Sequence, residues 1–261
     1  MKLAILGGGP GGYTAAVRAA QLGMETVLIE KDKNLGGTCL NRGCIPTKAL
    51  VEAAARFRDT EHASEFGIDI PEGKIEVCVS RMQERKNGVV RRLAMGVDGL
   101  MKKNGVTVIH ELGRLLDGRH VQIGGDVSEF DAVILATGSS VAVPPVFPVD
   151  GVKVITSDHI LNIDHIPESM IVAGSGAVGM EFASIFAAFG SKVSIVEMAP
   201  RLMPLEDGEV SAEMQRLCRK SGISVLPDVP PIAWKSRTAV LRSLVPVFLK
   251  KDWKLKFCWL P

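Results

Sequence analysis

Two cysteines, Cys39 and Cys44, are separated by four residues in the glycine-rich segment GGTCLNRGCIPTKAL, residues 36–50. The whole chain has five cysteines in 261 residues, too few for a scaffold held together by disulfides. Two thiols this close could exchange with a disulfide, form a permanent bridge or bind a metal ion. Which chemistry is open to them depends on the local structure that positions their sulfur atoms.

The residues around the second cysteine are typical of a helix start. Pro46 suits the first helical turn, and TKALVEAAARF continues with good helix formers. Cys44 would then lie at a helix N-terminus, where the helix dipole stabilises a thiolate and lowers the thiol pKa. Along a regular helix the step from Cys39 to Cys44 would rise about 7.5 Å, more than the Cα separation of about 4.4 to 6.8 Å in disulfides. The two can bond only if the chain bends, and the segment NRG, residues 41–43, would permit it.

The alternatives to a redox-active pair are less well supported by the sequence. No second cysteine pair or histidine cluster supplies further metal ligands. A permanent disulfide is unusual in the cytoplasm, and two unrelated buried thiols would not need the flanking glycines. Lys48, one turn after Cys44, would project toward the same region and could hold negative charge. Cys78, Cys218 and Cys258 are expected to be ordinary thiols.

The N-terminal segment KLAILGGGPGGYTAAVRAAQLGMETVLIE, residues 2–30, has the pattern of a dinucleotide-binding βαβ unit. An apolar strand leads into Gly7, Gly9 and Gly12, an alanine-rich helix follows, and a second strand ends in Glu30. Glycines let the backbone approach a pyrophosphate at the helix N-terminus, and the acid can accept hydrogen bonds from a ribose. The full ordered pattern predicts a dinucleotide site rather than a plain βαβ unit.

The same pattern returns in MIVAGSGAVGMEFASIFAAFGSKVSIVE, residues 170–197. Its glycines are Gly174, Gly176 and Gly179, and its second strand ends in Glu197. Two such motifs predict two dinucleotides, a flavin and a nicotinamide that exchange electrons. An acid at the ribose position repels a 2′-phosphate, so NAD is favoured over NADP, although the basic Arg201 lies nearby in the sequence.

The segments between the two motifs predict further elements of an α/β protein. Residues 80–103 have the apolar spacing of a long amphipathic helix. The stretch LLDGRHVQI, residues 115–123, reads as a hairpin, and VILATGSS, residues 133–140, as a strand with a small turn. The proline-rich residues 141–151 are the expected linker.

Composition narrows the class of protein. An apolar content of 46% suffices for a substantial core, most simply in two domains. The N-terminus lacks the features of a signal peptide, and no apolar run reaches the roughly 18 residues of a membrane span. We therefore expect a cytoplasmic protein that binds neither membranes nor nucleic acids.

Residues 1 to about 228 resemble the pyridine nucleotide–disulfide oxidoreductases, and within them the dihydrolipoyl dehydrogenase branch. The most specific match is GGTCLNRGCIPTKAL, which is similar to the redox-active segment of that branch, and AILGGGPGGYTAA, VILATGSS and the second glycine motif follow in the family's order. The resemblance implies a Rossmann-type FAD-binding domain with the cysteine pair at residues 1–148. It also implies a partial Rossmann-type NAD-binding domain at residues 149–228.

The resemblance assigns roles to individual residues. Those expected to bind FAD are Gly7, Gly9, Gly12, Glu30, Gly36, Gly37, Thr38, Lys48, Gly113, Thr137, Gly138 and Ser139. Those expected to bind NAD are Gly174, Gly176, Gly179 and Glu197. The expected catalytic residues are Cys39, Cys44, Lys48 and Glu181, with Cys44 beside the flavin, Cys39 exchanging with substrate and Glu181 near the nicotinamide.

The implied reaction passes electrons from dihydrolipoamide through a Cys39–Cys44 disulfide and FAD to NAD⁺. The substrate would be carried by a lipoyl-bearing protein of a 2-oxoacid dehydrogenase or glycine cleavage complex, and the family forms homodimers. In the family, the acid–base pair is a His with a Glu from a C-terminal interface domain. The family also has an Ala-x-Gly-Asp-like FAD-binding motif after the NAD domain. Neither is recognisable here, so we expect this interface domain to be absent and the chain to be active only if the missing half is restored.

Residues 229–261 differ from the rest of the chain. They contain seven Lys/Arg residues, one acid (Asp252) and all three tryptophans, and they do not resemble the family. The simplest hypothesis is a frameshift near residue 228. The alternative is a basic segment that binds an anionic membrane surface. Pro246 argues against this alternative, because it interrupts the helix that such a segment would form. An NAD domain without its later strands would have an exposed sheet edge and apolar surface.

Two functional alternatives remain open at this stage. The chain could be a non-catalytic module that binds a flavin or NAD without lipoamide turnover. Among enzymes, the mercuric and glutathione reductases are related alternatives. Glu197 argues against an enzyme that uses NADPH, and the residues LNRG and IPT around Cys44 favour the lipoamide branch.

Overall fold

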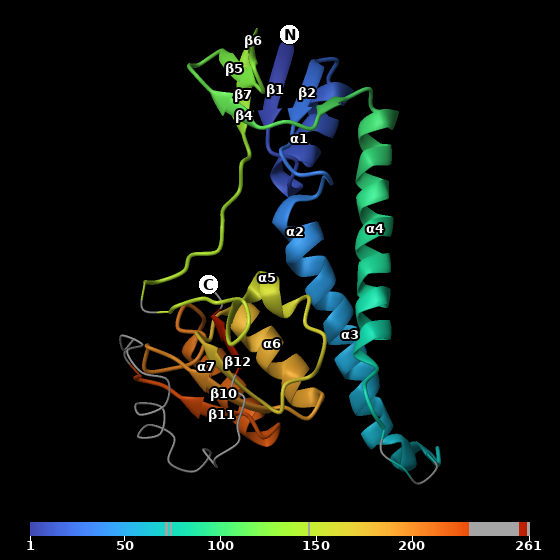
Figure 1. Ribbon diagram of the computed structural model, residues 1–261, viewed down its shortest axis with the longest axis vertical. Helices are drawn as coiled ribbons and strands as arrows, with labels where there is room; N and C mark the ends of the chain where they lie inside the picture. Colours follow the sequence, from blue (N-terminus) through green and yellow to red (C-terminus); the bar gives the residue numbers. More distant parts are fainter. Residues whose placement is uncertain (71–72, 74, 146, 230–255, 260–261) are drawn as a thin grey trace. The chain divides into compact units, whose positions relative to one another are not determined.

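The structure is a computed structural model that describes residues 1–70, 73, 75–145, 147–229 and 256–259, the last four by their backbone. The chain divides into two compact units (Figure 1). The first unit comprises Met1–Lys48 and Glu84–Ser140, and the second comprises Ala49–Gln83 and Val141–Pro261. Each contains a parallel sheet with helices, which confirms the predicted α/β class.

The first unit is built on a four-stranded parallel sheet in the order β3-β2-β1-β7. Its strands are β1 (Lys2–Leu6), β2 (Glu25–Ile29), β3 (Thr107–Ile109) and β7 (Ala132–Leu135). Alternate residues of β1 point to opposite faces, so Leu3 and Ile5 enter one apolar cluster while Ala4 and Leu6 enter another. Both faces of the sheet are therefore covered by apolar side chains.

Helices cover one face of this sheet and a small antiparallel sheet covers the other. The helical face contains residues of α1 (Pro10–Gln21) and α4 (Val79–Lys103), which agrees with the helix predicted over residues 80–103. The antiparallel sheet is formed by β4 (Gly113–Leu115), β5 (His120–Ile123) and β6 (Asp126–Glu129). The hairpin predicted at residues 115–123 is confirmed, and β6 is a third strand that the sequence pattern did not predict.

The second unit repeats the strand–helix–strand arrangement of the first. Its parallel sheet has the order β11-β10-β9-β12-β8. The strands are β8 (Val154–Thr156), β9 (Ser169–Ala173), β10 (Lys192–Val196), β11 (Ser224–Leu226) and β12 (Lys256–Trp259). The helices are α5 (Ser157–Ile160), α6 (Ala177–Ala188) and α7 (Gly208–Lys220).

The strand β12 differs from what we expected of the C-terminal segment, residues 229–261. We expected the later strands of this sheet to be missing, but the backbone of β12 pairs in parallel with both β8 and β9. It takes the position beside β9 that β7 takes beside β1 in the first unit. The residues KFCW suit a strand because aromatic residues have high β-propensity. The remaining residues of the expected tail, 230–255 and 260–261, lie outside the described residues.

Two further helices complete the described chain. They are α2 (Gly37–Arg42) and α3 (Cys44–Glu61), and a short 3₁₀ helix, η1 (Ala63–Phe66), follows. The later part of α3 contributes Leu50 and Ala54 to the core of the second unit, together with Phe182 and Phe186 of α6. Over the residues that the structure describes, no helix is both long and apolar enough to cross a membrane.

The core of the first unit can be tested with a pair of leucines. Leu28 of β2 is fully buried at 0% exposure, whereas Leu112 is 66% exposed. We expect Leu28→Ala to lower the free energy of unfolding by about 2–5 kcal/mol, since it leaves a cavity between the sheet and its helices. Leu112→Ala should change it by less than about 0.5 kcal/mol. Urea denaturation followed by circular dichroism measures both, and equal losses would contradict the assigned core.

Candidate functional site

The two cysteines lie at the junction of two helices. Cys39 belongs to α2 and Cys44 is the first residue of α3, with Gly43 (φ −139°, ψ −115°) breaking the helix between them. A Cβ on Gly43 would lie 3.0 Å from the carbonyl oxygen of Thr38 and 3.2 Å from the Cα of Cys39. This close approach favours glycine at the break between the two helices. The predicted bend is confirmed, but it occurs at Gly43 alone, since residues 41 and 42 are helical.

The two thiols are free and interact with each other. Cys39 is partly buried and Cys44 is exposed. Burial raises the pKa of Cys39, and the hydrogen bond with the Cys44 side chain and the negative charge of a Cys44 thiolate raise it further. A hydrogen bond with the Cys44 backbone and the positive charge of Lys48 act in the opposite direction but leave the pKa of Cys39 above its ordinary value. The structure thus brings Cys39, Cys44 and Lys48 together, as predicted.

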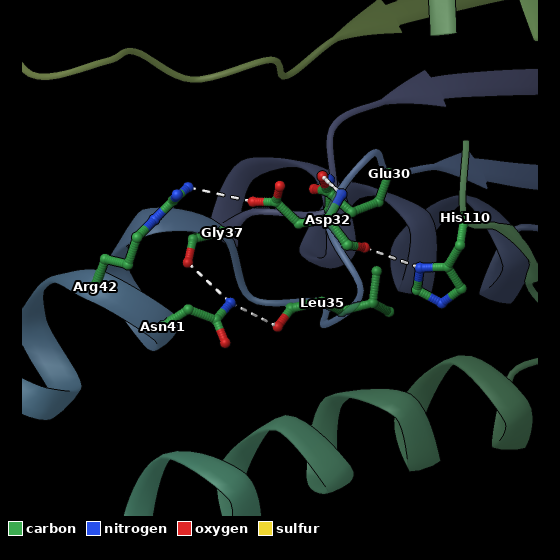
Figure 2. Close-up of polar contacts among 8 residues, drawn as sticks. Glu30, Asp32, Leu35, Gly37, Asn41, Arg42 and His110 are labelled. Atoms are coloured by element: carbon green, nitrogen blue, oxygen red, sulfur yellow. Dashed lines mark hydrogen bonds and ion pairs between the residues drawn. The ribbon is translucent and has the colours of Figure 1, made fainter. Parts of the chain in front are cut away.

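Asn41, between the cysteines, ties α2 to the loop before it (Figure 2). Its Nδ2 donates to the carbonyl oxygen of Leu35 at 3.1 Å and to that of Gly37 at 3.0 Å. Its Oδ1 is buried and, within the described residues, has no hydrogen-bond partner. The amide thereby holds the turn at Gly36 and Gly37, both of which have positive φ angles.

Asp32 also holds this loop in place through contacts with Arg42 and His110, as Figure 2 shows. Its carboxylate accepts from Arg42 Nη2 at 3.2 Å, and its carbonyl oxygen accepts from Nδ1 of His110 at 3.0 Å. The ion pair is exposed and contributes little stability. Its effect is positional, because it joins the end of α2 to the loop that follows β2.

The first glycine turn has no room for a side chain at Gly7 or Gly12. A Cβ on Gly12 would lie 1.7 Å from the carbonyl oxygen of Gly7, and one on Gly7, whose φ is +102°, would lie 2.2 Å from the carbonyl oxygen of Ala136. Gly9 caps the start of α1, and a Cβ on Gly37 would lie 2.6 Å from the Cα of Gly9. Two other segments of the chain, at Ala136 and at Gly37, therefore pack against the backbone of this turn.

Several residues predicted to bind FAD thus lie close together. The segments at Gly7–Gly12, Gly36–Gly37 and Ala136–Thr137 converge beyond the ends of β1 and β7. Thr137, Gly138 and Ser139 are exposed there, as is Thr38 on α2. Gly113 lies in β4, where a Cβ would be 2.9 Å from Ile29 Cγ2, so its closest neighbours are core side chains.

Glu30 closes the first turn with a buried carboxylate. Its side chain is 7% exposed. Oε2 accepts a hydrogen bond from the Gly8 N–H at 2.7 Å, and Oε1 accepts one from the Asp32 N–H at 2.8 Å. A buried acceptor beside a glycine turn at a helix N-terminus is the donor and acceptor set that an ADP moiety requires.

The second glycine turn has the same construction. A Cβ on Gly179 would lie 2.4 Å from the carbonyl oxygen of Gly174, whose φ is +99°, and Gly176 caps α6. Glu197 Oε2 accepts from the Ser175 N–H at 2.8 Å, and Oε1 accepts from the Ala199 N–H at 2.8 Å. Both glycine turns therefore fit a dinucleotide, because each lets the backbone pass close to itself at a helix N-terminus, whose N–H groups can bind phosphates.

Burial raises the pKa of Glu197, but hydrogen bonds outweigh this and hold it below its ordinary value. The donors are the Ala199 N–H, the Ser175 hydroxyl and N–H, and the Met198 N–H. The carboxylate is therefore ionised at neutral pH. Glu181, predicted to lie near the nicotinamide, belongs to α6 and is partly buried.

Two features of these sites were not predicted. Ser175 occupies a position of the glycine motif at which the pattern requires no particular residue type, yet it hydrogen-bonds Glu197. Cys78 was expected to be ordinary, and this was wrong. The Ser80 hydroxyl, 3.4 Å from its Sγ, and the backbone and guanidinium of Arg81 lower the pKa of Cys78 to about 7.

With the geometry established, comparison with known proteins identifies the family. The profile described as pyridine nucleotide-disulphide oxidoreductase matches residues 1–241. The chain belongs to the pyridine nucleotide–disulphide oxidoreductase family. The match extends past residue 228, where the resemblance by motif ended.

Curated members of this family are similar over most of the chain. The dihydrolipoyl dehydrogenase of Bacillus subtilis (strain 168) is 44% identical over 229 residues, which cover 86% of this chain and 50% of that protein. That of Acholeplasma laidlawii is 40% identical over 232 residues, covering 86% of this chain and 68% of that protein. The chain thus spans between half and about two thirds of these relatives.

A solved structure supports the same relationship. The HOCl-induced flavoprotein disulfide reductase RclA from Escherichia coli has a TM-score of 0.73 and 29% identity, covering 88% of this chain and 49% of that one. The chain is therefore related to flavoprotein disulfide oxidoreductases and is similar in sequence to dihydrolipoyl dehydrogenases.

The coupling between the two thiols predicts how Cys39 reacts. Cys44→Ala removes a hydrogen bond and a negative charge that raise the pKa of Cys39, so alkylation of Cys39 at neutral pH should accelerate by about 2- to 10-fold. Lys48→Met removes a positive charge that lowers this pKa, so alkylation should slow. Iodoacetamide labelling with peptide mass spectrometry measures both rates, with Cys78 as the internal reference. Changes of the same sign in the two variants would contradict the assignment.

Proposed function

We propose that this chain provides the flavin-binding, redox-cysteine and NAD-binding parts of a dihydrolipoyl dehydrogenase. The observation that carries the proposal is the bent helix junction at Gly43, where the thiols of Cys39 and Cys44 interact beside Lys48. A metal site or two unrelated thiols would not require this junction. The similarity to dihydrolipoyl dehydrogenases selects the substrate class, a dihydrolipoamide.

The cysteines carry out the thiol chemistry of the proposed reaction. A thiolate of dihydrolipoamide attacks Sγ of Cys39 in the Cys39–Cys44 disulfide, the disulfide bond breaks, and Cys44 leaves as a thiolate. The second substrate thiolate then attacks the substrate sulfur of the mixed disulfide and displaces Cys39. Oxidised lipoamide is released, both cysteines are reduced by one electron pair, and the two substrate protons pass to solvent or to a base.

Leaving-group ability supports the choice of Cys39 as the attacked sulfur. The raised pKa of Cys39, due first to burial, disfavours its departure as a thiolate. Exposure alone would favour attack at Cys44, the more accessible sulfur in the protein by itself. A flavin held against Cys44 would cover it and remove this conflict.

The glycine turns are the proposed cofactor sites. The residues that would hold FAD are Gly7, Gly9, Gly12, Glu30, Lys48 and Gly113, with the segments at residues 36–38 and 137–139. Gly174, Gly176, Gly179 and Glu197 would hold NAD, with Glu181 near its nicotinamide. When bound, FAD would accept the electron pair of the reduced cysteines and deliver a hydride to NAD⁺. The domain limits 1–148 and 149–228, the homodimer, a lipoyl-bearing partner and a cytoplasmic location are parts of the same proposal.

The structure also favours NAD over NADP, and with it the lipoamide branch over reductases that use NADPH. In the proposed NAD site, the ionised carboxylate of Glu197 would repel a 2′-phosphate. The Nη2 of Arg201, the nearby cation noted in the sequence, donates to the carbonyl oxygens of Pro204 at 3.1 Å and Glu206 at 3.0 Å. A guanidinium engaged in this way is poorly placed to bind a phosphate.

Thiol exchange can be tested on the chain without turnover. The oxidised protein is mixed anaerobically with dihydrolipoamide, and the new protein thiols and the oxidised lipoamide are quantified after quenching. We expect one equivalent of disulfide to be reduced, and Cys39→Ser and Cys44→Ser to slow this by at least about 100-fold, since a hydroxyl cannot exchange with a disulfide. Cys78→Ser is the matched control and should react at the wild-type rate.

The position of the mixed disulfide provides a second test. In Cys44→Ser, the Cys39 thiolate should attack the disulfide of oxidised lipoamide, which forms a mixed disulfide on Cys39 and releases the second lipoamide sulfur as a thiolate. Alkylation of that thiolate with iodoacetamide prevents ring closure, and the trapped adduct is identified by mass spectrometry. In Cys39→Ser, the adduct on Cys44 should form more slowly once FAD is bound. Failure of wild-type protein to be reduced by dihydrolipoamide, while a general dithiol reduces it, would overturn the proposed substrate class.

A further inference from the structure

The two dinucleotide turns differ at one informative position. In both, a carboxylate accepts a hydrogen bond from the backbone N–H of the residue 22 positions earlier, which is Gly8 in the first turn and Ser175 in the second. Gly8 has no side chain, whereas Ser175 adds a hydroxyl that donates to Oε2 of Glu197 at 2.6 Å. The acid of the second turn therefore has a donor that its counterpart lacks.

The hydrogen bonds of Ser175 fix the direction of its hydroxyl. Its Oγ accepts from the backbone N–H of Met203 at 3.0 Å, and its proton points to the carboxylate of Glu197. The reverse orientation is excluded because an ionised carboxylate has no proton to donate. Ser175 is 0% exposed and Glu197 is 8% exposed, so both groups lack the freedom of a surface pair.

Ser175 also anchors the loop that follows Glu197. Met203 has a φ of +46°, which a side chain disfavours, and its N–H bond to Ser175 helps to hold it there. The Arg201 guanidinium donates to two carbonyl oxygens of the same loop, and the Ser211 hydroxyl donates to that of the buried Leu202. The loop beside the carboxylate is thus ordered by the protein itself.

We propose that Ser175 is a positioning residue that makes the second turn specific for a dinucleotide with a free ribose 2′-hydroxyl. The inference rests on the proposed NAD site. Two donors from Ser175 and one from Ala199 hold the Glu197 carboxylate in place, where it accepts from a 2′-hydroxyl and repels a 2′-phosphate. Without the hydroxyl, the carboxylate could turn away from a phosphate and the loop could release Arg201 toward it.

The proposal predicts a change in discrimination rather than a uniform loss of binding. Calorimetric titration of the chain with NADH and with NADPH gives a Kd for each. Ser175→Ala, and Ser175→Gly as the match to Gly8, should weaken NADH binding and lower the ratio of the NADPH Kd to the NADH Kd by about tenfold or more. Using both variants keeps the test valid if one of them folds poorly.

Ser191→Ala is the matched control. It removes a buried serine hydroxyl bond in the same unit, to the carbonyl oxygen of Pro167, and involves neither Glu197 nor the loop that follows it, so its Kd ratio should equal that of the wild type. Equal changes in the two affinities for the Ser175 variants, no change, or an equal fall of the ratio in Ser191→Ala would each overturn the role of Ser175. A wild-type chain that binds NADPH as well as NADH would instead overturn the proposed NAD site.

Discussion

In each unit the fold and the nucleotide turn depend on one steric constraint. The chain leaves the first strand, turns on a glycine with positive φ, and passes so close to itself that Gly12 and Gly179 have no space for a Cβ. The same closeness brings the turn within hydrogen-bonding distance of the acid that ends the second strand. Strand pairing, helix start and acceptor position are therefore set by a single geometry, used twice.

The cysteine site also depends on a close backbone approach at a glycine. Gly43 packs against the backbone of Cys39 where the helix breaks between the two cysteines, and burial together with Cys44 raises the pKa of Cys39. The neighbouring polar contacts of Asn41 and Asp32 hold the loop that joins this junction to β2. The reactive groups lie on helix ends, while the rigidity that positions them comes from backbone contacts.

Much of this was predictable because it depends on local sequence. The glycine spacing, the terminal acids and Pro46 each impose their conformation on a few neighbouring residues, and the structure has the expected strands and helices there. Features that depend on distant partners were not predictable. The strand β12 forms by pairing with β8 and β9, and the role of Ser175 depends on Glu197 and Met203, which lie 22 and 28 positions away. The lowered pKa of Cys78 has local causes, the Ser80 hydroxyl and Arg81, but it depends on side-chain conformations that the sequence pattern does not define.

The pairing of β9 with β12 has a kinetic consequence. The strand–helix–strand unit from β9 to β10 is continuous in sequence, but β9 finds its other neighbour only at residues 256–259. The first unit has the same delay, since β1 pairs with β7 and Lys2 bonds Asp131 across 129 positions. Contacts this distant in sequence form slowly. During synthesis both glycine turns can therefore form early. One edge of β1 and one edge of β9 then remain unpaired until β7 and β12 have been synthesised.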